Sequence, residues 1–460
     1  MTHDTRLVRH EEQIEELRKT IPEWIRNLER PPTPMLVPKF GPLAGIRVVS
    51  TGIVIAQPWT GTKMAMFGAE VIHVERPGGD IHRRTAPNLV RGKRVHGCDW
   101  ANEAVCRLSM GLNFKDPKGL ELLMALWKIS DVWMESSAPG TLERSGITPE
   151  LALAVNPKLV ILRVCTYGQY GDEQMLGRPG YDALGQAFGG LIAVTGDEAG
   201  PPQRAKVYTA DYLTALHGWA AVMMALWHAR ETGQGQVIDN SQYEAVHVTM
   251  GFQMPWISGE GKYTTHKGNK APGFQPYDTF ECKDGHVFIG ALGPIIYSRV
   301  PGFLGLDPEE YSYENCSLDE AAVYSEKGLE LDAKLREYCK NRTKMEVEKA
   351  FNAAQIGCCR VMNAEDMLKE PHFRMRETHV PVVDRQSGVP VRVGGITPKL
   401  SLTPGQVWRG APAIGEDTTN IMTKILGFSE EEALGYYASG ITHRTEPFEE
   451  PVVEPLEGWN

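Results

Sequence analysis

The sequence predicts an α/β protein: a large domain built on a doubly wound, mostly parallel open sheet of Rossmann type, followed by a smaller α+β lobe. Strand, helix and strand patterns follow one another at 46–75, and helix-then-strand patterns return at 118–135 and 150–164. Such alternation is typical of parallel crossover units. A polar, glycine-bearing connection then leads to a short hairpin pattern around Asp284 and Gly285, which predicts the lobe.

These patterns divide the 460 residues into four segments. We expect a helical arm with a proline-rich linker at 1–38, the large domain at 39–255, the small domain with its linkers at 256–385, and a C-terminal segment at 386–460 that returns to the large domain. The arm carries one apolar stripe at helical spacing, formed by Ile14, Leu17, Ile21, Trp24 and Leu28. It serves either docking and oligomerisation or packing on its own subunit.

Inside the arm, Thr20 with Glu23 fits a capping box, and Pro22 predicts two short helices instead of one. The large domain opens with the strand IRVVS, the helix WTGTKMAMFG and the strand AEVIHVE. A long apolar helix is predicted from about Asp211 to Glu231, and GQGQVIDNSQYEAV restarts with a strand and a helix. In such a sheet the ligand lies outside the carboxyl ends of the strands.

Composition excludes several classes of protein. The net charge of −10 argues against general binding to nucleic acid or to anionic membranes. The start lacks the apolar core of a secretory signal, and the longest apolar stretch, 219–227, is far below the roughly 20 residues that span a bilayer. Eight cysteines without CxxC spacing indicate reduced thiols and no zinc site. We expect a cytoplasmic protein without a metal.

Several catalytic motifs are missing. The first strand runs into STGIVIAQPW, which lacks the GxGxxG that admits a pyrophosphate, so Glu75 at the end of the second strand is weak support for a nicotinamide site. The P-loop, zincin and serine-hydrolase motifs are also missing from the sequence. The stretch from Arg76 to Arg107 contains seven basic residues and only three acidic ones. This local excess of positive charge predicts either a phosphate clamp or a solvated loop.

Seven collinear segments carry a resemblance to a known family. They are PKFGPLAGIRVV, FGAEVIHVERPGGD, NPKLVILRVCTYGQYG, PGYDALGQAFGGL, YTADYLTALHG, RETGQGQVID and PGQVWRG. From about Lys39 to Leu434 the chain resembles the class III CoA-transferases, of the formyl-CoA transferase and L-carnitine CoA-transferase type. PKFGPLAG, YTADY and PGQVWRG place it nearest to the carnitine branch.

The resemblance implies that Asp211, the aspartate of YTADY, is the catalytic residue. A carboxylate suits an acyl-CoA:carboxylate CoA-transferase because it forms a mixed anhydride and then an aspartyl-CoA thioester, without ATP or a metal. Each attack builds an oxyanion that backbone N–H groups would stabilise. From the residues alone, an N-cap of the apolar helix is the competing interpretation of Asp211.

The resemblance also implies the residues that bind coenzyme A. The loop of Val54, Ile55 and Ala56 would wrap the thiol end through its backbone, while Arg76 and Arg107 would hold the nucleotide end. Buried crossover packing is the alternative for the loop. Residues flanking the substrate or forming a lid would be Tyr167, Gln169, Tyr181, Gly268 and Gly273; THKGNKAPG has only these two glycines, fewer than the four-glycine lid of formyl-CoA transferase.

The acceptor acid stays open. Carnitine would need aromatic faces or a carboxylate for its quaternary ammonium, which Trp59, Tyr208, Phe252 and Trp256 would supply. The same aromatic residues suit benzylsuccinate, phenyllactate or another bulky or hydroxy acid, or plain core packing.

Two other functions share the predicted fold. The first is an epimerase of the α-methylacyl-CoA racemase type, which needs a His/Asp pair; His217 is predicted to lie off the face of Asp211. The second is an inactive partner subunit, which the presence of Asp211 disfavours. The resemblance further implies an interlocked homodimer, with a heteromer containing a related subunit as the alternative.

Overall fold

The computed structural model describes residues 10–271 and 273–445 and divides into two compact units. The first unit comprises 1–191, 205–250 and 374–460, and the second comprises 192–204 and 251–373. The boundaries expected from the sequence for the large domain, 39–255, and for the small domain, 256–385, stay a prediction. Among the described helices, none has the length and apolar character needed to cross a membrane.

The first unit holds a seven-stranded sheet in the order β14-β5-β2-β1-β6-β7-β8. Every neighbouring pair is parallel except β14 with β5. The strands are β1 (Arg47–Ser50), β2 (Glu70–Glu75), β5 (Leu108–Leu112), β6 (Val132–Glu135), β7 (Val160–Cys165), β8 (Val237–Ser241) and β14 (Thr442–His443). Without β14 this is the doubly wound order, which reverses between β1 and β6. The predicted fold class is confirmed.

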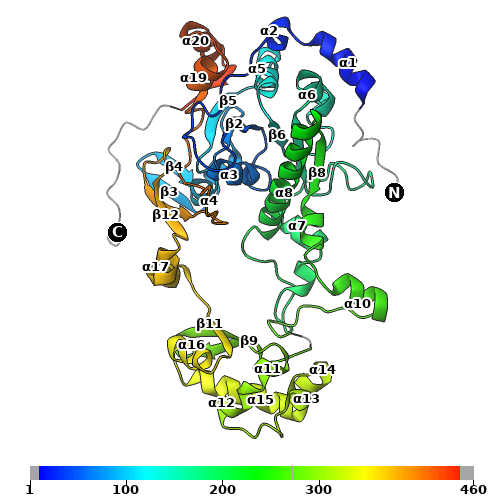
Figure 1. Ribbon diagram of the computed structural model, residues 1–460, viewed down its shortest axis with the longest axis vertical. Coiled ribbons are helices and arrows are strands. Elements are labelled where there is room, and N and C mark those ends of the chain that lie inside the picture. The colour runs from blue at the N-terminus through cyan, green and yellow to red at the C-terminus, as the bar shows by residue number, and fades with distance from the viewer. Residues whose placement is uncertain (1–9, 272, 446–460) are drawn as a thin grey trace. The chain divides into compact units, whose positions relative to one another are not determined.

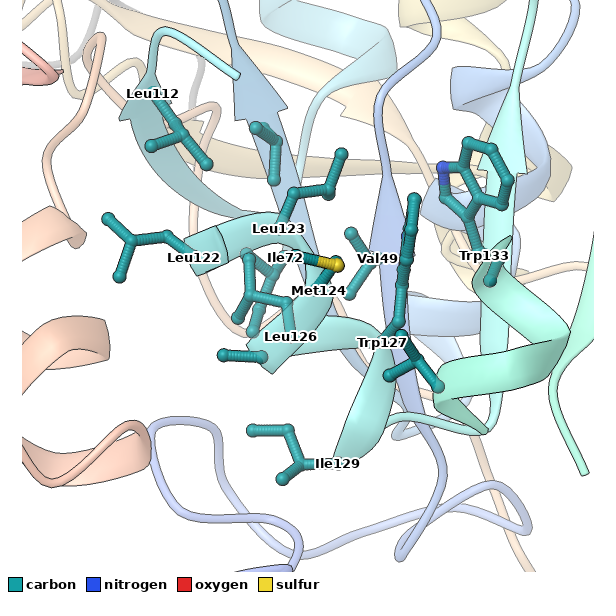
Figure 2. Packing of buried hydrophobic residues seen from close by; sticks show 14 of the residues in the cluster. Val49, Ile72, Leu112, Leu122, Leu123, Met124, Leu126, Trp127, Ile129 and Trp133 are labelled. Carbon is teal, nitrogen blue, oxygen red and sulfur yellow. The ribbon is translucent and has the colours of Figure 1, made fainter. Parts of the chain in front are cut away.

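Successive residues of these strands face opposite layers, as the pleat of a strand requires. On one face Val48, Val132 and Leu162 pack with α3 (Pro58–Met66) and α8 (Thr209–Thr232). On the other face Val49, Trp133 and Ile161 pack with α5 (Pro117–Lys128) and α6 (Pro149–Val155). Figure 1 shows α8 running alongside β8, and Figure 2 shows the side chains of α5 gathered against the sheet.

The N-terminal arm forms two helices, α1 (Glu11–Thr20) and α2 (Glu23–Arg26), as expected. The fully buried Ile14 and Ile25 join the core under α5 and α6, so the arm packs on its own chain. The expected capping box is wrong, because the Thr20 hydroxyl donates to the Leu17 carbonyl at 2.8 Å and α2 has no side-chain cap.

The remaining elements of the first unit surround the sheet. Between β2 and β5 lie η2 (Ile81–Arg84), the hairpin of β3 (Asn88–Arg91) and β4 (Arg94–Gly97), and α4 (Cys98–Glu103). After β6 and β7 come η3 (Glu143–Ser145) and α7 (Asp182–Phe188), and α9 (Gln242–His247) follows β8. The C-terminal part adds β12 (His379–Val383), β13 (Pro390–Gly394), α19 (Thr418–Asn420), η5 (Ile421–Ile425) and α20 (Glu430–Ala438). The short helix α18 (Pro371–Met375) begins in the second unit and ends in the first.

The second unit is an α+β lobe around the antiparallel sheet β11-β10-β9. The predicted hairpin is formed by β9 (Tyr277–Cys282) and β10 (Gly285–Gly290), and β11 (Gly357–Arg360) pairs with β10. The helices are η4 (Ile192–Val194), α10 (Gln253–Glu260), α11 (Gly293–Tyr297), α12 (Arg299–Leu304), α13 (Tyr313–Cys316), α14 (Glu320–Val323), α15 (Glu326–Lys340), α16 (Lys344–Ala353) and α17 (Ala364–Lys369).

Candidate active site

Asp211 lies in the first turn of α8, with its side chain buried. Because α8 connects β7 to the parallel strand β8, this turn lies at the carboxyl edge of the sheet. Only 5% of Asp211 is exposed. A carboxyl at this position is placed where ligands of doubly wound sheets bind.

The N-cap interpretation of Asp211 is wrong, because a different aspartate caps α8. Tyr208 occupies the N-cap position without a side-chain hydrogen bond. Instead, Asp182 of α7 accepts the backbone N–H of Ala210 at 2.8 Å and that of Asp211 at 3.3 Å through Oδ1. Its Oδ2 accepts from Gln186 at 2.7 Å. The Asp211 carboxyl is therefore not used to cap its own helix.

A glutamine holds the Asp211 carboxyl. Gln242, the first residue of α9, donates from Nε2 to Oδ1 of Asp211, and its own Oε1 accepts from the hydroxyl of Thr166. Thr166 follows β7, so the three residues come from the ends of three different elements, β7, α8 and α9. All three are at least nine-tenths buried, and together they form one hydrogen-bonded chain.

A second polar group lies beside Asp211. The hydroxyl of Tyr212 donates to Oε1 of Glu103, and Oε2 of Glu103 lies 2.9 Å from Nε2 of His82. Glu103 is only 1% exposed. The ring of Tyr212 also packs edge-on against Trp59 of α3, with the ring centroids 4.8 Å apart.

These surroundings raise the pKa of Asp211 to about 8, mainly because burial penalises the charged carboxylate. The negative charges of Asp182 and Glu103 raise this pKa further, whereas the hydrogen bond from Gln242 lowers it. A carboxyl with such a pKa is a strong base for a carboxylate once it is ionised. Strongly raised values of this kind are typical of functional sites.

The loop that follows β1 has an unusual backbone. Val54 adopts a φ of 66°, a left-handed conformation that is rare for a β-branched residue. Its N–H donates to Asp80 at 3.0 Å, while Ile55 and Ala56 are buried at 1% and 8% exposure. Backbone strain of this kind concentrates at functional sites.

The two predicted nucleotide-binding arginines differ in access. Arg76 is exposed just after β2. Arg107 is buried, stacks over Trp100 at 5.0 Å from the ring centroid and donates to the Glu103 carbonyl at 3.0 Å. Burial lowers the pKa of Arg107 to about 10. Within the described residues its Nε and Nη1 atoms have no partner.

The basic segment from Arg76 to Arg107 does not fold as one patch. Arg83 is buried in a two-point ion pair with Glu75, at 2.6 and 2.7 Å, while Arg84 and Lys93 face solvent. Both carboxylate oxygens of Glu75 are engaged by Arg83, and Oε1 also accepts from the Ser109 hydroxyl at 2.6 Å. Glu75 therefore has a structural role, and the weak nicotinamide interpretation loses its acid.

The residues predicted to flank the substrate differ in their exposure to solvent. The ring of Tyr167 packs on Phe188 at a centroid distance of 5.4 Å. Gln169 is buried, with its N–H donating to Asp239 at 2.8 Å, whereas Tyr181 is 62% exposed at the start of α7. The structure thus places Tyr181, but not Gln169, on the surface.

The predicted lid glycines, Gly268 and Gly273, belong to the second unit. Gly268 has a φ of 69° and donates its N–H to the Gly196 carbonyl at 2.8 Å. It lines a cavity of about 870 Å³ within this unit. The four aromatic candidates for the acceptor also divide, with Trp59 and Tyr208 in the first unit and Phe252 and Trp256 in the second.

His217, the histidine considered for epimerase chemistry, is exposed on α8, and its Nδ1 lies 2.9 Å from the Leu213 carbonyl. Sequence reasoning missed the residues that surround Asp211: Asp182, Gln242, Thr166 and Glu103. Asp182 and Gln242 stand in the quoted segments PGYDALGQ and VIDNSQYEAV, at the starts of helices. Only the placement of both elements against the first turn of α8 gives these residues their roles.

Comparisons with known proteins agree with this architecture. Residues 43–418 match the family model described as CoA-transferase family III. The chain is 33% identical over 422 residues to the bile acid CoA-transferase BaiK of Clostridium scindens, covering 88% of this chain and 90% of that protein. It is 32% identical over 401 residues to the succinyl-CoA–L-malate CoA-transferase beta subunit of Chloroflexus aurantiacus, covering 85% and 96%.

Solved structures show the same fold. A CAIB/BAIF family protein from Brucella suis has a TM-score of 0.74 at 24% identity, covering 84% of this chain and all (100%) of that one. The Mycobacterium tuberculosis protein Rv3272 has a TM-score of 0.69 at 22% identity, covering 83% and 99%.

Proposed function

This chain belongs to CoA-transferase family III, and on that basis we propose that Asp211 is the nucleophile that carries the transferred groups. The family and its named relatives make the chain an acyl-CoA:carboxylate CoA-transferase. The observation that carries the proposal is a buried carboxyl at the carboxyl edge of the sheet, freed from helix capping by Asp182 and held by Gln242.

The reaction proceeds by four exchanges at carbonyl carbons. An oxygen of ionised Asp211 attacks the thioester carbon of the acyl-CoA, which forms a mixed anhydride and releases the CoA thiolate. The thiolate attacks Cγ of Asp211, which gives an aspartyl-CoA thioester and frees the first carboxylate. A second carboxylate attacks the same Cγ and expels the thiolate. The thiolate then attacks the new acyl carbon, which yields the product CoA ester and restores the Asp211 carboxylate.

The surroundings of Asp211 suit this chemistry. Its low exposure limits the access of water, which would hydrolyse an anhydride. The first turn of a helix favours negative charge on the attacking carboxylate. The raised pKa also makes the ionised form a stronger base, and nucleophilicity increases with basicity within one class of nucleophile.

Coenzyme A is the cofactor-like substrate of the reaction. We propose that the strained loop of Val54, Ile55 and Ala56 contacts its thiol end through backbone groups. This loop follows β1 next to β6, at the point where the strand order reverses and where doubly wound sheets bind their ligands. Arg76 and Arg107 remain the proposed residues for the nucleotide end; the exposed Arg76 is accessible to a phosphate as it stands.

The acceptor is a free carboxylic acid, and we propose a bulky or hydroxy acid. The names of two relatives mention a bile acid, which is bulky, and L-malate, which is a hydroxy acid. A carnitine-like acid and benzylsuccinate stay within this proposal. Tyr167, Gln169 and Tyr181 are the proposed substrate neighbours, and the segment with Gly268 and Gly273 is the proposed lid.

We also propose a cytoplasmic homodimer as the working enzyme. The name of the Chloroflexus relative contains the words beta subunit, so a heteromer with a related chain is the alternative assembly. Epimerase chemistry is not favoured, because the Nδ1 of His217 faces the carbonyl of its own helix. The inactive-subunit alternative is not favoured either, because the buried carboxyl of Asp211 is retained with a donor to it.

Trapping with hydroxylamine tests the proposal. The protein is incubated with succinyl-, butyrobetainyl- or crotonobetainyl-CoA and hydroxylamine, then digested with trypsin. Asp211 lies in the tryptic peptide 207–230, whereas Asp182 falls in a different peptide. We expect a hydroxamate at Asp211 and none at Asp182. Absence of the modification with every donor, or modification of Asp182 instead, contradicts the proposal, and a panel of free acids then identifies the acceptor.

A further inference from the structure

We propose that Gln242 is a catalytic residue, whose side-chain amide donates to the oxyanion that forms on Asp211 when its Cγ is attacked. This inference rests on the proposed role of Asp211 and adds a named side chain to the groups that stabilise the intermediates. It follows from the hydrogen bonds around one carboxyl oxygen.

The two oxygens of Asp211 are not equivalent. Oδ1 accepts from Nε2 of Gln242. Within 10–271 and 273–445 the structure gives Oδ2 no hydrogen-bond partner. Oδ2 is therefore the oxygen that is free to attack an acyl-CoA, and Oδ1 is the oxygen that stays with the protein.

The orientation of the Gln242 amide follows from its two partners taken together. The hydroxyl of Thr166 donates to Oε1, which leaves Nε2 facing Asp211. The reverse orientation would place Oε1 against an ionised carboxylate, and two acceptors repel each other there. An N–H donor thus points at Oδ1 whenever Asp211 is charged.

Two glycines allow this close packing. A Cβ atom at Gly180 would lie 1.8 Å from the Thr166 hydroxyl oxygen, so no other residue fits beside that threonine. A Cβ atom at Gly185 would lie 3.0 Å from Cβ of Gln242 and 3.1 Å from Cβ of Ala210. Because α7 approaches both α8 and α9 here, Gln242 has little freedom to move away from Asp211.

The chemistry makes Oδ1 the atom that becomes an oxyanion. After Oδ2 attacks the thioester carbon, Oδ1 is the carbonyl oxygen on the aspartyl side of the anhydride. Attack of the CoA thiolate on Cγ moves the π electrons of that carbonyl onto Oδ1. The bond from Cγ to Oδ2 then breaks, and Oδ2 leaves in the first carboxylate. The second carboxylate attacks the same Cγ, and Oδ1 carries the charge again.

The first and last exchanges differ in this respect. Their oxyanions form on the carbonyl oxygen of the substrate acyl group, and the contact of Gln242 is with Oδ1. Loss of the Gln242 amide is therefore expected to slow the two attacks on Cγ more than the attacks on the acyl carbon. A residue that merely supports the fold would slow all four exchanges alike.

The test compares Gln242→Met with the wild-type protein and with Gln236→Met, a control at an exposed glutamine of the same segment. Each protein is mixed with one acyl-CoA, quenched rapidly and weighed intact by mass spectrometry. Wild type and control are expected to carry mainly the CoA adduct. In Gln242→Met the acyl adduct should accumulate instead, and the transfer rate should fall by about 10²–10³, the effect of removing one oxyanion donor.

Thr166→Val provides a second variant, which retains the amide but removes the donor to its Oε1 and loosens its position. We expect the same shift toward the acyl adduct with about a tenfold slower transfer, smaller than full donor loss. This variant decides the matter if Gln242→Met does not fold. Equal slowing with an unchanged ratio of adducts would overturn the role of Gln242 while leaving Asp211 as the nucleophile. A wild-type protein without either adduct would instead remove the proposed function.

Discussion

Oδ1 of Asp182 accepts the backbone N–H of Asp211 at 3.3 Å, so one aspartate caps the helix on which the other is presented. Capping and chemistry would otherwise compete for the same carboxyl, because an N-cap side chain folds back onto its own helix. Here α7 supplies the cap to α8 from outside. The carboxyl of Asp211 is thereby left for the partner on α9.

Replacing Asp211, the proposed nucleophile, should abolish transfer without unfolding the protein. Asp211→Asn keeps an acceptor for Gln242 and leaves the cap by Asp182 in place. We expect the transfer rate to fall by at least about 10⁴, as when other covalent nucleophiles are removed. Steady-state kinetics measures the loss, and circular dichroism checks the fold. A variant that transfers CoA at the native rate would contradict the role of Asp211.

The raised pKa of Asp211 predicts how stability depends on pH. Folding raises this pKa from the ordinary 3.8 to about 8, so the folded state binds the proton more tightly than the unfolded state. The stabilisation by that proton is complete below pH 3.8 and is lost as the pH rises through 8.

Asp211→Asn lacks this titration and serves as the reference for the wild type. The wild type should lose stability relative to Asp211→Asn as the pH rises from about 5 to 8. The free energy of unfolding of the variant minus that of the wild type should therefore increase by up to about 1.4 kcal/mol per pH unit. Urea denaturation of both proteins at several pH values measures the difference. A difference that stays constant with pH would mean that Asp211 titrates normally.

The pH dependence of the rate should respond to Glu103. Its charge helps to raise the pKa of Asp211, and Glu103→Gln removes the charge while keeping an acceptor for Tyr212. In the proposed mechanism the ionised carboxylate of Asp211 is the reactive form, so the rise of kcat/KM with pH should move to lower pH, by up to about one unit. Asp172→Asn, at an exposed residue, should leave the profile unchanged; an identical profile for Glu103→Gln would exclude its influence.

The buried pair of Glu75 and Arg83 should support stability. The guanidinium of Arg83 holds the pKa of Glu75 at about 2, against the opposing effect of burial. Glu75→Gln leaves the arginine charge without its carboxylate, which typically costs 3–5 kcal/mol, so we expect about that loss in the free energy of unfolding. Denaturant unfolding measures it, with Lys19→Met at an exposed ion pair as a control expected to change stability by less than about 1 kcal/mol.

The sequence predicts the large sheet well because its signals are local. Strands such as IRVVS and KLVILRV are short apolar runs, and α5 and α6 carry apolar faces that need a sheet. The hairpin around Asp284 and the two helices of the arm are predicted for the same reason. The capping box expected at Thr20 shows the limit of such local signals. The Thr20 hydroxyl can bond either to the following helix or to its own, and in the structure it donates to the Leu17 carbonyl of its own helix.

The candidate site is harder to predict because its contacts join distant parts of the chain. Asp211 is found through a motif, but Asp182 and Gln242 reach it from α7 and α9, and sequence patterns contain no signal for such a pairing. Charge counting misleads in a similar way. Arg83 belongs to a basic segment, yet it is buried in an ion pair with Glu75. Only the folded structure distinguishes it from its exposed neighbours.

The outside cap on α8 has an evolutionary consequence. Because Asp182 caps the end of α8, a copy of this chain with an uncharged residue at position 211 would keep its architecture and, on the proposed mechanism, lose only its reactivity. On the same proposal, gene duplication followed by a single substitution would give a folded but inactive subunit, and a mixed assembly with one working centre would need no change of fold.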